Sequence, residues 1–466
     1  MKINVIGCGY LGTVHAACLA TLGHEVMGVD TDVAKVERLS HGDPGFFEPG
    51  LPELLAQALG SGRLSFATEP TPAEVYFLTV GTPQVTDGLA ADVSFVHAAI
   101  DSILPVASLD AVVVGKSTVP VGTAAGLVDK LGGRALVWSP EFLREGFAVA
   151  DTLHPDRLVY GLPDDPATAC RAQNALDQVY ESMLAADVPR LTMNYATAEL
   201  VKMAANSFLA TKISFMNTMA ELCECTGGDV TLLAEALGLD ARIGPLFLRA
   251  GIGFGGGCLP KDIRAVIARA TELGVDDTVS FLHHVDAINQ HSRDRVVDRA
   301  LQLLGDEPEG KKVTVLGASF KPNSDDIRDS PALEVADRLH DQGAEVTVTD
   351  PQALFGVHRS FPHLHTESDI TAALTGAELV LLLTEWQEFS HLDPQATIDL
   401  VERPQLIDGH RLLLRRNQPT PLWPPQVCSN SIGGHVQPNL PLGFRRVLEM
   451  QRTDEPQMYI DNALRL

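Results

Sequence analysis

The sequence predicts an α/β protein in which two doubly wound, Rossmann-like domains are joined by a long helix in an all-helical middle domain. Three observations predict it: a strand, a glycine-rich turn and a helix at the N-terminus, an unbroken helical stretch at 195–226, and a second strand–helix–strand pattern at 313–350. We expect the domains to cover 1–194, 195–300 and 301–416, followed by a peripheral or partly disordered tail at 417–466.

Composition narrows the functional classes before any motif is considered. The 466 residues carry 35 Lys and Arg against 60 Asp and Glu, a formal net charge of −25, which argues against a nucleic-acid or anionic-membrane binder. The opening MKINVIGCGYLG has no signal-peptide pattern, and apolar runs such as 379–383 are far too short to span a membrane. We therefore expect a soluble, cytoplasmic protein.

The N-terminal pattern indicates a dinucleotide-binding unit. The apolar run at 2–7 leads into GCGYLG at 7–12, a helical pattern follows at 13–22, and the next strand-like run ends at Asp30. The first two glycines permit a tight turn and close approach to a pyrophosphate, and the third lets helix and strand pack. Asp30 can accept hydrogen bonds from the adenosine ribose and would repel the 2′-phosphate of NADP, so the pattern favours NAD.

The stretch 195–226 contains neither Pro nor Gly and is rich in Ala, Met, Leu, Glu and Lys, so it predicts one long helix. Such a helix is too long for a compact sheet layer, and we expect it to form the middle domain and a subunit interface. Lys202 and Asn206 lie four residues apart, so they share one face of the helix and can converge on a ligand. Their apolar neighbours favour a position near an interior cleft.

The segment 248–262 carries the strongest chemical signal. It reads LRAGIGFGGGCLPKD, and its glycines would let the backbone approach a ligand closely. Cys258 precedes Pro260, which suits the first turn of a helix. A cysteine at a helix N-terminus, close to Lys261 and Arg249, is expected to have a lowered pKa and to act as a nucleophile.

The seven cysteines are odd in number and scattered. They show neither Cys-x-x-Cys pairs nor the Cys/His spacing of a metal site, so we expect no metal and a reducing compartment. Apart from Cys258, we expect them to be small core residues: Cys8, Cys18, Cys170, Cys223, Cys225 and Cys428.

Residues 313–350 repeat the opening theme. VTVLG reads as a strand, 331–342 as an amphipathic helix, and AEVTVTD as a strand that ends in Asp350. Gly317 stands alone where the first unit has three glycines, which indicates adaptation to another ligand. Two α/β units that flank a helical domain imply a cleft between them, where a substrate usually binds.

Several motifs together resemble the UDP-glucose/GDP-mannose dehydrogenase family across residues 1–412. The motifs are VGTP (80–83), KSTVPVGT (116–123), SPEFLREG (139–146), the Lys202/Asn206 pair, GFGGGCLPKD (253–262) and FKPNSDDIRDSPAL (320–333). EPGL (48–51), HPDRLVYG (154–161) and RIGPLFLRAGIGFGG (242–256) are most similar to the members that act on UDP-glucose. Three departures from the family pattern are Gly257 in place of Ser, Ser139 in place of Asn, and DGHR at 408–411.

The resemblance implies a four-electron, NAD-dependent oxidation of UDP-glucose to UDP-glucuronate through a cysteine thiohemiacetal and thioester, in a homodimer or higher homo-oligomer. A nucleophilic cysteine is explained by this chemistry, because a simple alcohol dehydrogenase does not need one. The implied catalytic residues are Cys258, Lys202, Asn206, Asp262, Glu141 and Thr118. The implied NAD-binding residues are Gly7, Gly9, Tyr10, Leu11, Gly12, Asp30, Lys35, Thr82, Thr118, Glu145, Lys261 and Arg328. The implied substrate-binding residues are Glu141, Phe142, Leu143, Arg144, Lys202, Asn206, Arg242, Phe247, Leu248, Arg249, Ala250, Gly251, Gly255, Lys321 and Arg411.

Three alternatives stay open on the sequence. The same chemistry could act on GDP-mannose or a UDP-N-acetyl-hexosamine. A two-electron 3-hydroxyacid dehydrogenase would share the glycine motif and the Lys202/Asn206 pair, but would need neither Cys258 nor the second α/β unit. A nucleotide-sensing binding protein could keep the fold without the reaction.

Overall fold

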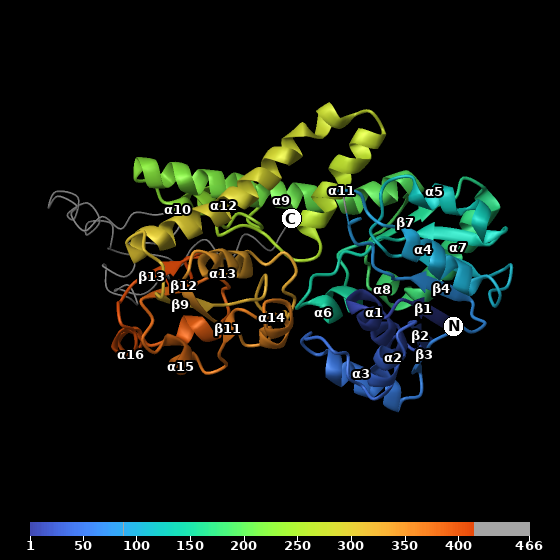
Figure 1. The fold of residues 1–466 in the computed structure, drawn as a ribbon. Coiled ribbons are helices and arrows are strands. Elements are labelled where there is room, and N and C mark those ends of the chain that lie inside the picture. Colours follow the sequence, from blue (N-terminus) through green and yellow to red (C-terminus); the bar gives the residue numbers. More distant parts are fainter. Residues whose placement is uncertain (87, 414–466) are drawn as a thin grey trace, which may run out of the picture.

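The computed structural model describes residues 1–86 and 88–413, and Figure 1 shows their arrangement. Two α/β units lie beside each other, and the long helices of the middle region run across both. The predicted tail at 417–466, including Cys428, lies outside the described residues.

The first unit is built on an eight-stranded sheet in the order β3-β2-β1-β4-β5-β6-β7-β8. Its strands from β3 to β6 are parallel, as predicted. The strand β7 differs, because it runs antiparallel to β6 and pairs through Trp138 and Gly161. The strand bounds are β1 Lys2–Ile6, β2 Glu25–Val29, β3 Leu64–Ala67, β4 Val75–Leu78, β5 Val112–Gly115, β6 Ala135–Trp138, β7 Leu158–Leu162 and β8 Arg190–Asn194.

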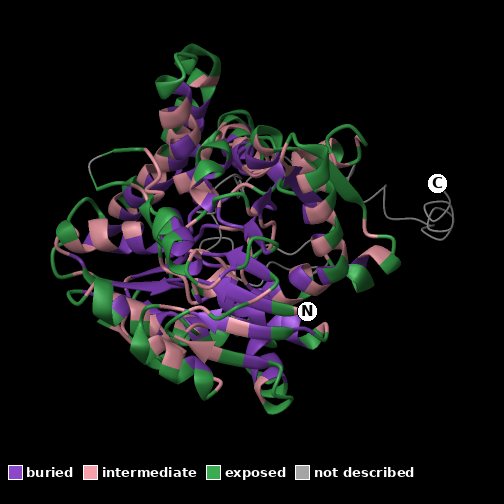
Figure 2. Cartoon of the chain, turned by 90° about the vertical axis from the view of Figure 1, so that its right-hand side faces the viewer, coloured by how far each residue is buried: buried purple, intermediate pink, exposed green. Residues whose placement is uncertain are grey.

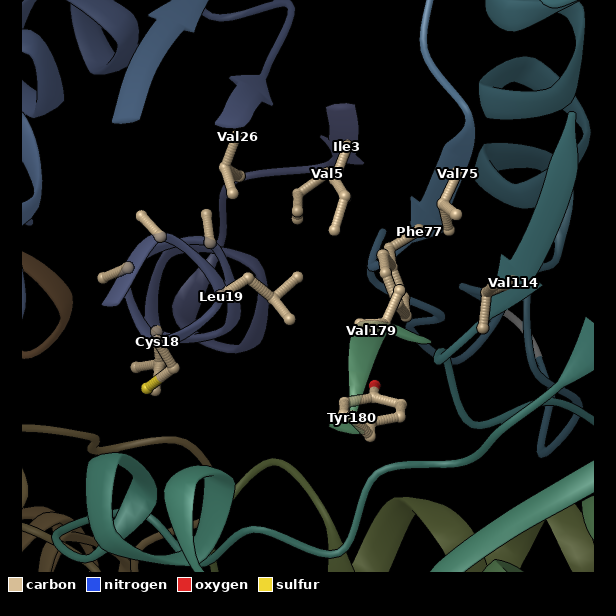
Figure 3. Close-up of a cluster of buried hydrophobic side chains, with 14 of the residues drawn as sticks. Ile3, Val5, Cys18, Leu19, Val26, Val75, Phe77, Val114, Val179 and Tyr180 are labelled. Atoms are coloured by element: carbon tan, nitrogen blue, oxygen red, sulfur yellow. The ribbon is translucent and has the colours of Figure 1, made fainter. Parts of the chain in front are cut away.

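The helices of this unit cover the sheet and close its core. In Figure 3, Leu19 points from the first helix toward Ile3 and Val5 of β1, and Phe77 of β4 lies near Tyr180. The first helix begins at Tyr10, three residues before the predicted start at 13, so the glycine loop leads directly into it. The helices are α1 Tyr10–Thr21, α2 Val33–Ser40, α3 Leu51–Gly60, α4 Ser94–Ile103, α5 Thr123–Leu127, α6 Ala148–Leu153, α7 Pro166–Val179 and α8 Glu181–Ala185.

The middle region is dominated by α9 (Tyr195–Thr226), which has the predicted bounds. Asn194 caps its start by accepting from the Thr197 N–H, and Gly227 ends it in the left-handed conformation. The other helices are α10 Val230–Gly238, α11 Leu259–Glu272 and α12 Ser280–Leu304. In the described part of the chain, none of the helices has the length and apolar character of a membrane span.

The second α/β unit has a five-stranded parallel sheet in the order β11-β10-β9-β12-β13. Figure 2, which turns the first α/β unit toward the viewer, shows buried residues concentrated in the strands and exposed residues on the outer helix faces. The strands of the second unit are β9 Lys312–Leu316, β10 Glu345–Thr349, β11 His365–Thr366, β12 Leu379–Leu382 and β13 Leu406–Asp408. Its helices are α13 Pro331–Asp341, α14 Leu354–Ser360, α15 Ile370–Leu374 and α16 Pro394–Leu400.

The prediction that every cysteine other than Cys258 packs in the core is wrong in part. Cys8, Cys18 and Cys223 are buried, but Cys170 and Cys225 are exposed. Cys225 follows Cys223 by two residues on α9, so the two side chains point to different sides of the helix and only one can face the core.

Candidate active site

The glycine loop after β1 has the geometry of a pyrophosphate cradle. The Gly7 N–H donates to the Val29 carbonyl oxygen at 2.8 Å. A Cβ at Gly12 would lie 1.9 Å from the Gly7 carbonyl oxygen, so only glycine fits there. At Gly9, no atom of the described residues lies within 4 Å of such a Cβ, and the backbone is open to a ligand. The loop therefore fits a dinucleotide at the N-terminus of α1, where Tyr10 and Leu11 lie.

Asp30 lies at the end of β2 beside this loop, as the sequence predicts. Its Oδ2 accepts from the Cys8 N–H at 2.9 Å and from Lys35 Nζ at 2.8 Å. On the other side of β1, Thr82 follows β4 and Thr118 follows β5. The Thr82 hydroxyl donates to the Thr118 carbonyl oxygen at 2.7 Å. Asp30 and the Thr82–Thr118 pair therefore both lie at the carboxyl edge of the parallel sheet, where dinucleotides bind in such sheets.

The predicted catalytic pair on α9 meets the start of α11. Asn206 Nδ2 donates to Asp262 Oδ2 at 2.6 Å, and Lys261 Nζ contacts Asp262 Oδ1 at 2.6 Å. Asp262 is 1% exposed, so its charge is stabilised by these two partners rather than by water. Lys202 Nζ lies 5.7 Å from the centre of the Phe142 ring. The structure thus brings side chains of α9, α11 and the 141–148 loop together.

Cys258 is the N-cap residue of α11 and is exposed. Although part of the residue is exposed, protein atoms crowd around its thiol. This desolvation raises the pKa of Cys258, whereas the sequence predicted a lowered pKa. Lys202 is the strongest opposing influence and lowers the pKa, with a smaller contribution from Lys261, while Asp262 raises it. The prediction of a lowered pKa is therefore wrong, because desolvation outweighs the nearby positive charges.

The glycines of the 251–257 loop serve contacts with the rest of the protein. A Cβ at Gly255 would lie 2.2 Å from the Asp329 carbonyl oxygen, and one at Gly257 would lie 2.5 Å from the Arg328 guanidinium carbon. Gly256 donates to the Arg328 carbonyl oxygen at 2.9 Å. The loop thus packs tightly against the second α/β unit just before Cys258, a role that its composition alone does not separate from ligand contact.

Glu141 is held by a lysine that the sequence analysis did not single out. Lys116 Nζ lies 3.0 Å from Glu141 Oε2, and both side chains are largely buried. Burial opposes the charge of Glu141, yet Lys116 and the backbone N–H of Phe142 outweigh it and lower its pKa to about 2. Lys116 directly follows the buried strand β5, which marks it as a candidate at the sheet edge, but its pairing with Glu141 has no local signal.

Glu145 forms a link between the two α/β units. Its Oε2 accepts from Ser324 Oγ at 3.2 Å, and its Oε1 lies 3.4 Å from Arg328 Nη2. Burial and the charge of Asp326 raise the pKa of Glu145 to about 7. Lys321 lies in the same region, where burial lowers its pKa. These predicted ligand residues therefore meet at one inter-unit contact.

Several predicted substrate residues have other partners or unusual backbone conformations. Arg144 binds Asp151 and is exposed, and Arg242 binds Asp240. Phe247 has a φ of +62°, an unusual conformation for a non-glycine residue. Arg411 has a φ of +55° and lies 3.6 Å from Asp229 at the start of α10. The other predicted substrate residues of these two segments differ in burial. Leu248 and Gly251 are buried, Leu143 and Ala250 are half-buried, and Arg249 is exposed.

A glycine loop that fits a dinucleotide, together with a group of side chains comprising a thiol, a lysine and a buried aspartate–asparagine pair, is typical of a dinucleotide-dependent dehydrogenase. Comparison with known proteins makes this class specific. The chain belongs to the UDP-glucose/GDP-mannose dehydrogenase family, since that family's NAD binding domain matches residues 1–184, its central domain 196–291 and its UDP binding domain 314–415.

Individual relatives agree with the family assignment. UDP-glucose 6-dehydrogenase of Rhizobium meliloti (strain 1021) is 38% identical over 418 residues, which cover 88% of this chain and 94% of the relative. A UDP-glucose dehydrogenase structure from Pyrobaculum islandicum is 39% identical with a TM-score of 0.79, covering 88% of this chain and 94% of that one. The UDP-N-acetyl-mannosamine dehydrogenase Cap5O from Staphylococcus aureus is 26% identical with a TM-score of 0.76, covering 93% and 99%.

Proposed function

We propose that the protein oxidises UDP-glucose to UDP-glucuronate with two molecules of NAD+ and uses Cys258 as a covalent nucleophile. The observation that carries this proposal is that Cys258, Lys202 and the Asn206–Asp262 pair meet where α9 contacts the start of α11. Relatives about 38% identical over most of the chain are named UDP-glucose 6-dehydrogenases, which favours UDP-glucose over the other nucleotide sugars. Cap5O, named for a UDP-N-acetyl sugar, is less similar at 26% identity.

The reaction divides into two oxidations and a hydrolysis. The primary alcohol loses two electrons and two protons to become an aldehyde, and the Cys258 sulfur then adds to the aldehyde carbon to give a thiohemiacetal. A second two-electron oxidation gives a thioester, which water cleaves to the carboxylate and the free thiol. NAD+, when bound at the glycine loop, supplies the hydride acceptor for both oxidations.

The side chains around the thiol have distinct roles in this scheme. Lys202 carries the positive charge that acts most strongly on Cys258, so it stabilises the thiolate and the negative charge that develops on the substrate oxygen. Asp262 fixes the amide of Asn206, whose oxygen stays available to hold the hydrolytic water. Glu141 stays ionised beside Lys116, so it orients groups in the site and is a weak proton acceptor, together with Thr118.

Stoichiometry tests the function directly. The purified enzyme should form two NADH per UDP-glucose consumed, with UDP-glucuronate as product and no free aldehyde. It should also prefer NAD+ to NADP+, because Asp30 repels a 2′-phosphate. A ratio of one NADH per substrate contradicts the four-electron reaction, and faster turnover of GDP-mannose or a UDP-N-acetyl-hexosamine contradicts the substrate.

The surface of α9 suggests the oligomeric state. Leu200, Phe208, Phe215 and Leu222 are each about half exposed or more and recur every seven or eight residues, so they form one apolar stripe on the helix. We propose that this stripe packs against α9 of a second copy of the chain, and that Arg242 then reaches the partner's site. We also place the enzyme in the cytoplasm, because the six cysteines in the described part of the chain are all free thiols, which favours a reducing compartment.

A further inference from the structure

A buried carboxylate outside the proposed catalytic site connects two ligand-binding loops. Glu48 is 2% exposed and lies between α2 and α3. Its Oε2 accepts from the Gly146 N–H at 2.6 Å and from the Tyr10 hydroxyl, and its Oε1 accepts from the Ala148 N–H at 2.7 Å. Both carboxylate oxygens are therefore used, by partners from two distant parts of the chain.

The partners of Glu48 belong to the two loops that carry the proposed ligand residues. Tyr10 begins α1 and follows the glycine loop that fits the dinucleotide. Gly146 and Ala148 end the 141–148 loop, which carries Glu141 to Glu145. The Glu48 carboxylate raises the pKa of Tyr10, as burial does to a greater extent, so the phenol stays protonated and donates its hydrogen.

The residues beside Glu48 extend the connection to the second α/β unit. The Phe46 ring packs against the Tyr10 ring in a tilted arrangement, with ring centres 4.9 Å apart. Phe47 packs against the hydrophobic cluster of the second α/β unit that contains Trp386 and Phe389. Three consecutive residues therefore make three different contacts. Phe46 contacts Tyr10 of the glycine loop, Phe47 contacts the second α/β unit, and Glu48 contacts the 141–148 loop.

We propose that Glu48 is a positioning residue that fixes the 141–148 loop to the dinucleotide loop, so that substrate-binding and cofactor-binding groups are held in register. This inference rests on the proposed function for what the two loops bind. Glu48 touches backbone groups at the end of the 141–148 loop, whereas Cys258, Lys202 and Asp262 lie on α9 and at the start of α11. Glu141 starts the same loop, but Lys116 also holds it, at 3.0 Å. Loss of Glu48 should therefore weaken binding more than it slows the chemical step.

The central test is Glu48→Gln, with Glu53→Gln as its matched control. Glutamine keeps the size of the side chain, but its amide nitrogen cannot accept from the Gly146 N–H. Glu53 lies on α3, five residues away, and is exposed, so the same change there should alter nothing. In Glu48→Gln we expect the KM for UDP-glucose to rise roughly tenfold and kcat to stay within about twofold.

Amide hydrogen exchange gives a readout that does not depend on activity. In Glu48→Gln without ligands, peptides that cover 141–148 should exchange roughly tenfold faster than in the wild type, while peptides from α9 should not change. Tyr10→Phe removes one of the donors and should give a smaller increase. The double variant should be no worse than Glu48→Gln alone, because both changes break the same connection.

The outcomes separate positioning from general stabilisation. A lower melting temperature with unchanged KM or unchanged exchange at 141–148 overturns the proposal. If Glu48→Gln does not fold, Tyr10→Phe decides in the same way. If the wild type makes no NADH from UDP-glucose, the proposed function fails, but the exchange comparison still decides whether Glu48 holds the loop.

Discussion

At the residue scale, Cys258 decides between a structural and a chemical thiol. Cys258→Ser keeps a hydroxyl of similar size but loses the thiolate and the reactive thioester. We expect net NADH production to fall by on the order of 10³-fold or more, while NAD affinity, which depends on the distant glycine loop, changes little. The measurement is steady-state turnover alongside NAD binding. Near-normal turnover with intact binding would show that the thiol only packs a turn.

A second residue-scale prediction concerns how Lys202 acts on the thiol. Desolvation raises the pKa of Cys258 and Lys202 lowers it. The thiolate is the form that reacts, and its fraction increases as the pH rises toward that pKa. Lys202→Met removes the charge at similar length, raises the pKa further, and should slow alkylation by iodoacetamide about 3–10-fold at pH 8. The rise of the alkylation rate with pH should move to higher pH.

The control for this prediction is Lys212→Met on the same helix, whose Nζ binds the Ile243 carbonyl oxygen. Its alkylation rate should match the wild type. Equal rates in all three proteins would mean that Lys202 has no electrostatic effect on Cys258.

At the element scale, the glycine-rich loop before α11 is tightly constrained by the second α/β unit. A Cβ at Gly255 would lie 2.2 Å from the Asp329 carbonyl oxygen, which belongs to the backbone and cannot turn aside. Gly255→Ala should therefore lower the free energy of unfolding by about 1–3 kcal/mol. The measurement is urea unfolding, with Gly126→Ala as control. Gly126 lies in α5, where no atom of the described residues would approach the new methyl group within 4 Å, so that change should be neutral or stabilising.

The elements also show which sequence signals are reliable. The bounds of α9 could be predicted because its interior lacks Gly and Pro, and Gly227 ends it in a left-handed conformation. The helix α12 was not predicted separately, since its many His, Asp and Arg residues give only a weak apolar stripe. Charged side chains of α12 are instead paired with residues far away in the sequence, for example Arg293 with Asp329 and Glu334. Such distant pairs have no local signal.

The same limit applies to the candidate site. The glycine loop, Asp30 and the Lys202/Asn206 spacing could be predicted because local motifs encode them. The Lys116–Glu141 pair and the raised pKa of Cys258 could not, because they depend on which segments meet in space and on how much water they exclude.

At the scale of the whole molecule, the apolar stripe on α9 predicts the assembly. Phe215→Glu places a charge in the middle of the stripe and should convert a dimer into monomers, as measured by sedimentation velocity. Leu109→Glu changes an exposed apolar residue outside α9 and should leave the assembly intact. A Phe215→Glu protein that sediments like the wild type would show that the stripe is not the interface.

The hydrogen bonds of the glycine-rich loop also matter for efforts to redirect the enzyme to another sugar. The Asn289 amide pairs with both the N–H and the carbonyl of Phe254, at 2.7 and 3.0 Å, so the buried core of α12 dictates the backbone path of that half of the loop. Phe247 and Arg249 are exposed, and no comparable anchor holds them among the described residues. A mutational library should therefore diversify the exposed Leu246, Phe247 and Arg249, keep the buried Leu248, and leave 253–257 untouched, because selection for new specificity needs positions that can vary without unfolding the scaffold.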